Sequence, residues 1–317
     1  MKQYLDVTDI ENLPKLIDEA IALKKNPFAF ETLGKHKTIG LLFFNSSLRT
    51  RLSTQKAAMQ LGMHCMVMNF TSEAWTIEFE DGTVMDGGTS EHIKEAAAVV
   101  SQYCDIIAVR AFPTLTDKEK DQSEFVLNNF KKYASVPIIN MESATAHPLQ
   151  ALADAITIME LKQTQKPKVV LSWAPHPKAL PHAVANSFTK MMQKMDVDFV
   201  ITHPEGYELD PEVTKKTPIM HNQKEAFKDA DFIYVKNWSN FKDYGKVLNQ
   251  DKSWTITNEQ MSVTNNGKFM HCLPVRRNMI VADEVLDSEQ SIVIQQANNR
   301  TFSAQVVLKN ILEELEK

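Results

Sequence analysis

Glycine is scarce in this chain, with only 9 among 317 residues, and the glycines form neither a G-x-G-x-x-G nor a G-x-x-x-x-G-K-[ST] pattern. In both nucleotide-binding motifs, glycines allow the backbone to approach a phosphate closely. Their absence disfavours a dinucleotide fold and a Walker-type phosphate loop. Any phosphate site in this protein has to be built without a glycine-rich loop.

Cysteine and metal-binding patterns are equally sparse. Cys65, Cys104 and Cys272 are odd in number, widely spaced and set in apolar surroundings, which argues against a disulfide framework or a cysteine-rich metal site. No H-E-x-x-H or C-x-x-C occurs, and the pair His176 and His182, with two prolines between, fits no common zinc pattern. We expect free thiols, no metal and no cofactor.

The chain also lacks basic stripes and long apolar runs. Its net charge is -5 and its 35 basic residues are scattered without interleaved aromatics, which disfavours nucleic acid as a partner. Nowhere do 18 uncharged apolar residues run together, and the first residues, MKQYLDVTDIENL, contain no apolar signal core. These features predict a cytoplasmic protein that binds a small anion rather than nucleic acid or a membrane.

Apolar runs alternate with helical patterns along almost the whole chain, and the runs are hydrophobic from end to end, as is typical of parallel strands covered on both faces. A length of 317 residues with 43% hydrophobic content suits two domains. The predicted strands are 38–44, 65–70, 105–112 and 136–140 in the first half, and 168–174, 198–203, 231–238, 268–273 and 291–297 in the second. The sequence therefore predicts an α/β protein with two doubly wound parallel-sheet domains.

The segment HPLQALADAITIMELKQTQKP, which starts at His147, is a long helical pattern closed by a polar, proline-bearing stretch, and it is the natural connector between domains. We place the domains at 1–150 and 151–300. The final residues, 301–317, are strongly helical, and we expect this helix to return and pack on the first domain. The two domains are thus predicted to be joined by long helices.

Polar residues follow the first predicted strand directly, in the segment Ser47-Leu48-Arg49-Thr50-Arg51. In an open α/β sheet, ligands lie outside the carboxyl ends of the strands, where helix N-termini present their free amides. Hydroxyls, backbone amides and a guanidinium fork at such a junction form a cradle suited to a phosphate. The alternative is a serine N-cap followed by solvated arginines.

Two more strand ends bring polar groups to the same edge of the predicted sheet. Arg110 lies near the end of the strand 105–112, and His147 with Gln150 opens the connector helix soon after the strand 136–140. A single histidine before a proline is more often a structural cap than a reactive group. Together with Arg49 and Arg110, however, His147 indicates an anion site.

Three motifs, S-L-R-T-R, H-P-L-Q and H-C-L-P, occur in this order at residues 47–51, 147–150 and 271–274. With them the chain resembles the carbamoyltransferases, the family of aspartate and ornithine transcarbamylases, along nearly its whole length. The resemblance implies that the first domain binds carbamoyl phosphate and the second binds the amine substrate, with an active site in the inter-domain cleft.

The resemblance also assigns roles to individual residues. Ser47, the backbone of Leu48, Arg49 and Thr50 hold the phosphate, whereas Arg110, His147 and Gln150 surround the carbamoyl group, and Cys272, Leu273 and Arg300 complete the pocket. The residues expected to act in catalysis are Arg49, Thr50, Arg110 and His147. Preorganised donors stabilise the negative charge that develops on the carbonyl oxygen when an unprotonated amine attacks, so no covalent enzyme intermediate is needed.

The identity of the amine follows from the second domain. Aspartate transcarbamylases carry H-P-L-P where this chain has H-C-L-P, and ornithine transcarbamylases carry an S-M-G motif that is absent here. The segments IYVKNW and RRNM, which contain Lys236 and Arg276, resemble the N-acylornithine transcarbamylases, whose substrate has a blocked α-amine. That branch implies acylornithine contacts from Glu142, His176, Lys236, Arg276 and Ser90. It also places Trp75 in the carbamoyl-phosphate site of a neighbouring subunit, which implies a homotrimer.

Two positions bear on the acyl group. Acetyl-type members carry a glutamate where this chain has Ser90 and a lysine where it has Ile280, and succinyl-type members typically have proline at the first position, so Ser90 matches neither pattern fully. Loss of a carboxylate at this position removes repulsion against a succinyl carboxylate, and Arg276 or Arg277 can pair with that carboxylate bidentately.

We therefore expect carbamoyl transfer from carbamoyl phosphate to the δ-amine of N-succinyl-L-ornithine, giving N-succinyl-L-citrulline and phosphate in arginine biosynthesis. N-acetyl-L-ornithine and free ornithine are the alternative acceptors. A non-catalytic ligand-binding homologue is the alternative from another class, but such a protein has no need to keep Arg49, Arg110, His147 and Arg300.

Overall fold

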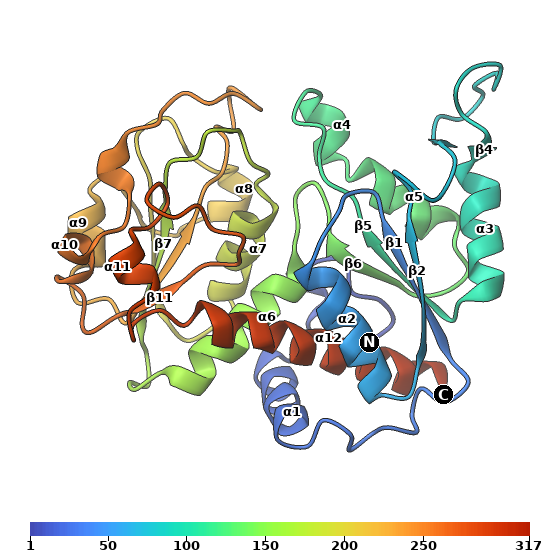
Figure 1. The fold of residues 1–317 in the computed structure, drawn as a ribbon, viewed down its shortest axis with the longest axis horizontal. Coiled ribbons are helices and arrows are strands. Elements are labelled where there is room, and N and C mark those ends of the chain that lie inside the picture. Colours follow the sequence, from blue (N-terminus) through green and yellow to red (C-terminus); the bar gives the residue numbers. More distant parts are fainter. The chain divides into compact units, whose positions relative to one another are not determined.

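Residues 1–317 are all described by the computed structural model, and they divide into two units (Figure 1). Unit 1 comprises Met1–Leu149 and Arg300–Lys317, and unit 2 comprises Gln150–Asn299. Each unit contains its own parallel sheet with helices, so the predicted α/β class is confirmed. None of the helices combines the length and the apolar content that crossing a membrane requires.

Unit 1 is built on a four-stranded sheet in the order β2-β1-β5-β6, with every neighbouring pair parallel. The strands are β1 (Thr38–Phe43), β2 (His64–Asn69), β5 (Ile106–Arg110) and β6 (Ile138–Glu142). In register, Phe43 lies beside Arg110, and Arg110 lies beside Glu142. The carboxyl ends of β1, β5 and β6 therefore meet at one place on the sheet edge.

Both faces of the central strands are covered, which explains why their sequences are apolar from end to end. Leu42, Ile107 and Val109 pack in one core cluster with Leu127 and Phe130. The latter two come from α5 (Phe125–Tyr133), and α3 (Ile93–Tyr103) packs beside α5 over the same face. The residues that alternate with these along the strands, such as Leu41 and Ala108, are also fully buried.

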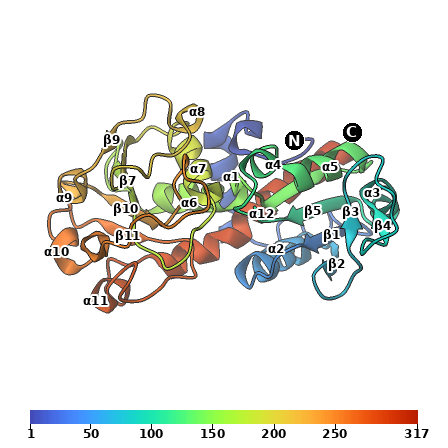
Figure 2. The ribbon, with the colours of Figure 1, turned by 90° about the horizontal axis from the view of Figure 1, so that it is seen from above.

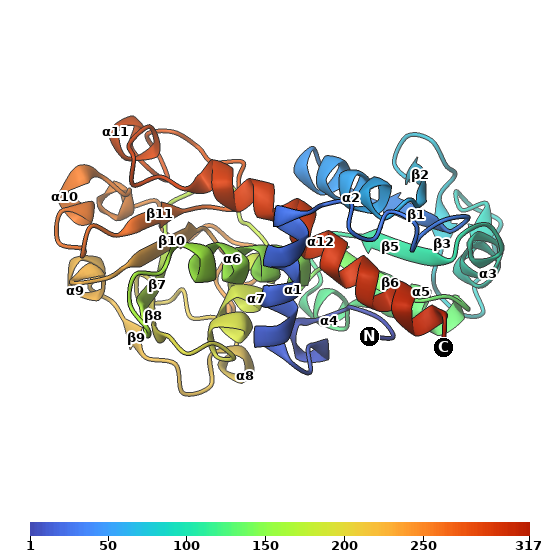
Figure 3. The ribbon, with the colours of Figure 1, turned by 90° about the horizontal axis from the view of Figure 1, so that it is seen from below.

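The remaining helices of unit 1 include both ends of the chain. The helix α1 (Leu13–Lys25) begins after Asn12, whose side chain accepts a hydrogen bond from the Lys15 N–H. The C-terminal part of α12 (Val293–Leu315) crosses α1, where Asn310 donates to Glu19 over 3.0 Å (Figure 3). The other elements of unit 1 are η1 (Val7–Asp9), α2 (Arg49–Gln60), α4 (Lys118–Gln122), β3 (Ile77–Glu78) and β4 (Glu91–His92), the last two lying beside α3 (Figure 2).

Unit 2 contains a five-stranded parallel sheet in the order β11-β10-β7-β8-β9. Its strands are β7 (Lys168–Trp173), β8 (Asp198–Thr202), β9 (Ile219–Met220), β10 (Phe232–Lys236) and β11 (Lys268–Met270). Ile233 and Val235 face a core cluster that includes Phe227, Met261 and Val285. The alternating residue Tyr234 stacks on Phe188 on the other face.

Helices of unit 2 cover both faces of this sheet. Phe227, Met261 and Val285 belong to α9 (Gln223–Phe227), α10 (Asn258–Met261) and α11 (Asp283–Leu286), whereas Phe188 belongs to α7 (Ala183–Met192). The connector predicted after His147 forms α6 (Pro148–Leu161), and the short elements α8 (Pro211–Thr214) and η2 (Lys252–Trp254) complete the set.

The strand predicted at 291–297 is wrong. Ser291 forms an isolated bridge with Phe269, and from Val293 the chain is helical in α12. Along this segment Val293 is buried and Ile294 is 75% exposed, while Gln296 is fully buried. This is a helical pattern in which a glutamine occupies the buried face, so the apolar residues alone did not show its period.

Gly40 in β1 offers a test of the packing behind the sheet edge. A methyl group on Gly40 would lie 2.8 Å from the Cys104 Sγ atom, so Gly40→Ala is expected to lower the free energy of unfolding by about 1–3 kcal/mol through overpacking. Adding Cys104→Ala removes the sulfur, and the double variant should recover at least about 0.5 kcal/mol relative to the sum of the single changes. Urea unfolding of the four proteins measures this coupling.

Gly87→Ala is the matched control, because a methyl group there meets nothing within 4 Å. Its unfolding free energy should stay within about 0.5 kcal/mol of the wild type. Strict additivity of the Gly40 and Cys104 changes would contradict the proposed contact.

Candidate active site

The chain leaves β1 and enters α2 through Ser47 and Leu48. The Ser47 hydroxyl accepts a hydrogen bond from the Thr50 N–H over 3.3 Å, and it thereby caps the first turn of the helix. Leu48 is largely exposed, and Arg49 starts the helix. The junction therefore has the helix N-terminus, hydroxyl groups and arginine that the sequence predicted, and the macrodipole of a helix favours an anion at this end.

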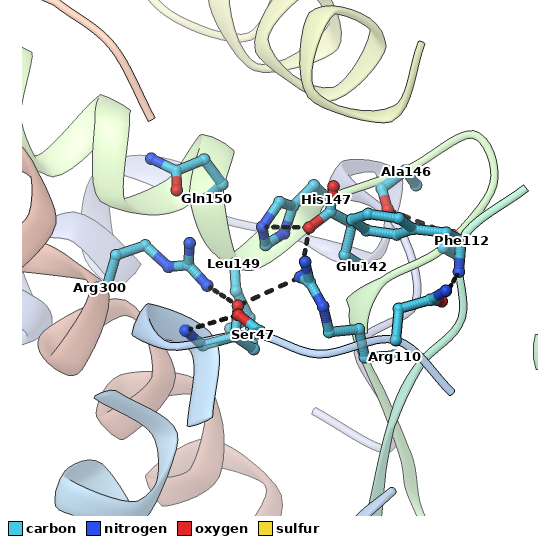
Figure 4. Close-up of polar contacts among 12 residues, drawn as sticks. Ser47, Arg110, Phe112, Glu142, Ala146, His147, Leu149, Gln150 and Arg300 are labelled. Atoms are coloured by element: carbon cyan, nitrogen blue, oxygen red, sulfur yellow. Dashed lines mark hydrogen bonds and ion pairs between the residues drawn. The ribbon is translucent and has the colours of Figure 1, made fainter. Parts of the chain in front are cut away.

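Two guanidinium groups share the hydroxyl of Thr50 (Figure 4). Arg110 Nη1 donates to Thr50 Oγ1 over 3.3 Å, and Arg300 Nη2 donates to the same oxygen over 3.0 Å. The three residues come from β5, α2 and α12, and each is less than 8% exposed. Unit 1 thus gathers two buried positive charges beside the first turn of α2.

Glu142 is the anionic partner within this cluster. Its Oε2 atom accepts a hydrogen bond from Arg110 Nη1 and lies 3.2 Å from His147 Nε2, so two donors converge on one oxygen atom (Figure 4). The Arg110 guanidinium also stacks over the Phe112 ring, 4.5 Å from its centroid. Donors that are fixed before the reaction and aimed at one oxygen are the geometry that stabilises an oxyanion.

Glu124 holds the loop that joins Glu142 to His147, and sequence reasoning missed it. Its Oε1 atom accepts hydrogen bonds from Ser143 Oγ (2.8 Å) and the Thr145 N–H (2.7 Å), and its Oε2 atom accepts from the Ala144 N–H (3.2 Å). Burial raises the pKa of this carboxyl group, and the hydrogen bonds that the carboxylate accepts offset part of that rise. The sequence signals this residue only as a glutamate at the start of the helical pattern SEFVLNNFKKYA, residues 123–134, where an acid in the first turn is common.

In unit 2, three predicted substrate residues follow the neighbouring strands β7, β10 and β11. Arg276 Nε donates to His176 Nε2 over 3.1 Å, and His176 Nδ1 lies 2.8 Å from the Lys178 carbonyl oxygen. Because an arginine Nε can only donate, the imidazole accepts at Nε2 and is neutral, and its Nδ1 atom also lies 3.1 Å from the Lys178 backbone nitrogen. Burial lowers the pKa of His176, and the charges of Arg276 and Lys236 lower it further.

The two adjacent arginines, of which the family resemblance assigned only Arg276 to the acylornithine site, have different partners. Arg277 forms ion pairs with Asp283 (2.8 Å) and Asp287 (2.6 Å) at the exposed start and end of α11. Arg276 instead contacts His176. Arg277 is accordingly engaged in a surface ion-pair network, and Arg276 is the arginine directed to the strand ends.

The other predicted residues lie in three places: in α6, after β11, and in the segment of β3 and β4. Gln150 is the third residue of α6, and its Nε2 atom donates to Asp154. Cys272 and Leu273 follow β11, where the Leu273 N–H donates to His271 Nδ1 over 2.8 Å. Trp75 and Ser90 lie in the segment that carries β3 and β4. The Trp75 side chain is 59% exposed, and its indole N–H donates to Glu91 over 2.6 Å.

Two parallel-sheet units, one with a cationic cluster at a helix N-terminus, define a class of two-domain α/β enzymes that bind anionic substrates. Sequence comparison narrows this class. The family model described as "Aspartate/ornithine carbamoyltransferase, carbamoyl-P binding domain" matches residues 2–160, and the one for the "Asp/Orn binding domain" matches 181–311. The chain belongs to the aspartate/ornithine carbamoyltransferase family.

Individual relatives resemble the chain over its whole length. N-succinylornithine carbamoyltransferase of Bacteroides thetaiotaomicron is 52% identical over 318 residues, which is 100% of both chains. N-acetylornithine carbamoyltransferase of Xanthomonas axonopodis pv. citri is 39% identical over 97% of this chain and 96% of its own length.

Among solved structures, a variant of N-acetyl-L-ornithine transcarbamylase complexed with carbamyl phosphate and N-succinyl-L-norvaline superimposes with a TM-score of 0.92 at 37% identity, covering 98% of this chain and 100% of the other. Further complexes of that enzyme with the same two ligands carry valine, proline or serine in place of one glutamate, where the first carries alanine.

Proposed function

We propose that the protein transfers the carbamoyl group of carbamoyl phosphate to the δ-amine of N-succinyl-L-ornithine, a cytoplasmic step of arginine biosynthesis that gives N-succinyl-L-citrulline and phosphate. The observation that carries the proposal is the convergence of Arg110 and Arg300 on the Thr50 hydroxyl, beside His147 and at the start of α2. Family membership supplies the reaction class.

The proposed mechanism assigns the phosphate to the first turn of α2. Ser47, the Leu48 backbone, Arg49 and Thr50 bind it, with Arg300 adding a second guanidinium. Arg110 and His147 already converge on one oxygen atom, that of Glu142, and we infer that they turn the same donors to the carbonyl oxygen of carbamoyl phosphate.

The chemistry then follows from these positions. The neutral δ-amine attacks the carbonyl carbon, negative charge develops on the carbonyl oxygen, and the donors stabilise that charge before the bond to phosphate breaks. Phosphate leaves as an anion held by Arg49 and Arg300, and it takes up the proton that the δ-nitrogen loses, so that the products are the neutral ureido group and hydrogenphosphate. Binding both substrates in contact supplies much of the remaining acceleration, because it converts a bimolecular step into a unimolecular one.

The acceptor is assigned from the charges at the strand ends of unit 2. N-succinyl-L-ornithine carries two carboxylates, and Lys236 and Arg276 are two cations at the ends of β10 and β11. His176 holds Arg276 in place by accepting from its Nε atom, which leaves the two terminal nitrogens of the guanidinium for a carboxylate.

Ser90 supports the same acyl group. The solved relatives that bind N-succinyl-L-norvaline are variants in which one glutamate is replaced, in one case by serine. We infer that this glutamate is the one that corresponds to Ser90 in the acetyl-type enzymes. A neutral residue there leaves the succinyl carboxylate without a like-charged neighbour.

We further propose that three copies of the chain assemble through α2 and β2. The strand β2 is an edge strand of the sheet, and its outward methionines, Met66 and Met68, are 54% and 41% exposed. Leu52 and Met59 on the neighbouring α2 are also exposed. An apolar surface over an edge strand suits a second copy of the chain, and Trp75, in the segment after β2, is the residue we expect to reach the adjoining subunit's carbamoyl-phosphate site.

Turnover with three acceptors tests the function. The purified protein is expected to form a carbamoylated product from N-succinyl-L-ornithine with a kcat/KM at least about tenfold higher than with N-acetyl-L-ornithine or L-ornithine, because one additional charge-assisted hydrogen bond is worth about 1.5–3 kcal/mol. Product formation is measured with carbamoyl phosphate in all three assays. Preference for the acetyl compound would contradict the acyl assignment, and no turnover with any acceptor would contradict catalysis.

Arg276 and Arg277 form a matched pair for the acyl pocket. Arg276→Met should raise the KM for N-succinyl-L-ornithine by about tenfold or more, since it removes a partner of a carboxylate. Arg277→Met should leave kcat and KM within about twofold and the unfolding midpoint nearly unchanged, because its ion pairs with Asp283 and Asp287 are exposed to solvent. Equal effects of the two changes on KM would contradict the distinction between the arginines.

Sedimentation equilibrium tests the assembly. The wild type is expected at three times the chain mass of 36.0 kDa. Replacing Met66 and Met68 together by lysine should yield monomers, because two charges on the apolar edge strand oppose association. Val99→Lys, at an exposed apolar position on α3, is the control and should leave the trimer intact. A monomeric wild type would overturn the proposal.

A further inference from the structure

Asp154 is a fully buried carboxylate in α6 that none of the preceding roles uses. It lies one helical turn after Gln150, and its Oδ1 atom is 2.7 Å from Gln150 Nε2 and also 2.7 Å from Gln296 Nε2 in α12. All three residues belong to unit 2, and each side chain is at most 1% exposed. A single carboxylate oxygen thus joins two buried amides.

The orientation of the first amide is fixed by the main chain. The backbone N–H of His271 lies 2.9 Å from Gln296 Oε1. A backbone N–H can only donate, so the group of Gln296 that faces it has to be the carbonyl oxygen. The NH₂ group of Gln296 consequently faces Asp154, and the Asp154 Oδ1 atom has to be an acceptor.

The orientation of the second amide follows from the first. Because Asp154 Oδ1 accepts from Gln296, the Gln150 group that contacts the same oxygen also has to be a donor, which is its NH₂ group. Gln150 Oε1 is then turned away from Asp154 as a hydrogen-bond acceptor. The main-chain N–H of His271 therefore determines, through Gln296 and Asp154, which atom Gln150 presents.

The same network reaches the H-C-L-P segment. The N–H of His271 binds Gln296, and the His271 Nδ1 atom accepts from the Leu273 N–H over 2.8 Å. Leu273 has a φ of 55°, which lies in the left-handed region that residues other than glycine rarely adopt. The contacts of His271 and its neighbours hold this backbone conformation, so Asp154 is anchored to both Gln150 and the start of the Cys272-Leu273 segment.

The surroundings of Asp154 suit a fixed acceptor. Tyr234, on the adjacent face of the β10 strand, is fully buried. Burial raises the pKa of its phenol well above the usual value, and Asp154 and Cys272 raise it further, so the Tyr234 phenol stays neutral. The Asp154 carboxylate is the charged member of this group, and it accepts the hydrogen bonds of both glutamines.

We propose that Asp154 is a positioning residue that makes the enzyme select a carbamoyl group by its NH₂ group. This inference rests on the proposed function and on the role that the family resemblance gives Gln150, which is to contact the carbamoyl group. The NH₂ group of a carbamoyl phosphate is a donor and needs an acceptor, which Gln150 Oε1 supplies only while Asp154 holds its NH₂ group. Acyl phosphates with a methyl group in that place gain nothing from this acceptor.

The experiment compares two stable phosphonates by calorimetry. Phosphonoacetamide keeps the amide of carbamoyl phosphate, whereas acetonylphosphonate has a methyl group in its place. Wild-type protein should bind the amide about tenfold more tightly, as expected of one hydrogen bond. Asp154→Leu, which removes the acceptor and lets the Gln150 amide turn its NH₂ group to the ligand, should weaken phosphonoacetamide about tenfold and change acetonylphosphonate less than about twofold.

Glu160→Gln is the matched control. Glu160 accepts from Asn299 over 2.8 Å, so it is a carboxylate that also joins α6 to α12. It lies almost three turns beyond Gln150 and has no part in orienting that amide. The selectivity ratio should be unchanged in this variant, and a loss equal to that of Asp154→Leu would reduce Asp154 to a general packing role.

A second variant covers a failure of Asp154→Leu to fold. Gln150→Met removes the acceptor that Asp154 is proposed to orient, and the ratio should fall in the same direction. An unchanged ratio in either folded variant contradicts the inference. Because the readout is equilibrium binding, it is separate from turnover: a wild type that discriminates between the phosphonates but carbamoylates no acceptor would contradict the proposed function alone.

Discussion

The common register of three parallel strands is the constraint on which the rest of unit 1 depends. Phe43, Arg110 and Glu142 stand side by side at the ends of β1, β5 and β6. A shift of one residue in any of these pairings would turn Arg110 or Glu142 to the opposite face of the sheet. The apolar packing of the buried strands thus fixes their register, and the register determines where the charged groups meet.

The residues at the ends of these strands show how buried charges are stabilised by several partners. Arg110 is neutralised by Glu142, stacked on Phe112 and bonded to Thr50, so its desolvation is offset by several partners. Arg300 reaches the same hydroxyl from a different part of the chain. The cluster therefore retains net positive charge where phosphate is proposed to bind, without a glycine loop.

Much of this arrangement could be predicted from sequence. Buried parallel strands are apolar from end to end, and the polar residues that come directly after them mark the edge of the sheet where a ligand binds. Ser47, Arg110 and His147 were found in this way. The segment 291–297 was misread because Gln296 occupies the buried face of a helix, and the distinction between Arg276 and Arg277 depended on side-chain partners that adjacent positions cannot reveal.

Positioning carboxylates were the hardest to predict. Glu124 and Asp154 act through contacts with residues about 20 and 142 positions away in the sequence. Nothing in their local sequence differs from an acid in a helix, since a glutamate near a helix start and an aspartate in a helical pattern are both commonplace. Only the fold shows that each carboxylate accepts hydrogen bonds from a segment that carries residues proposed to bind substrate.

The backbone of Glu124 has a consequence for how the protein can change. With φ of 53° and ψ of 42°, this residue lies in the left-handed region, a conformation that costs a residue other than glycine about 1 kcal/mol. Glycine would relieve that strain, yet it would also remove the carboxylate that accepts from Ser143, Ala144 and Thr145. The loss of several hydrogen bonds outweighs the strain, so the loop between Glu142 and His147 is the reason a strained glutamate is the more stable choice, and a search for more robust variants has to hold Glu124 constant.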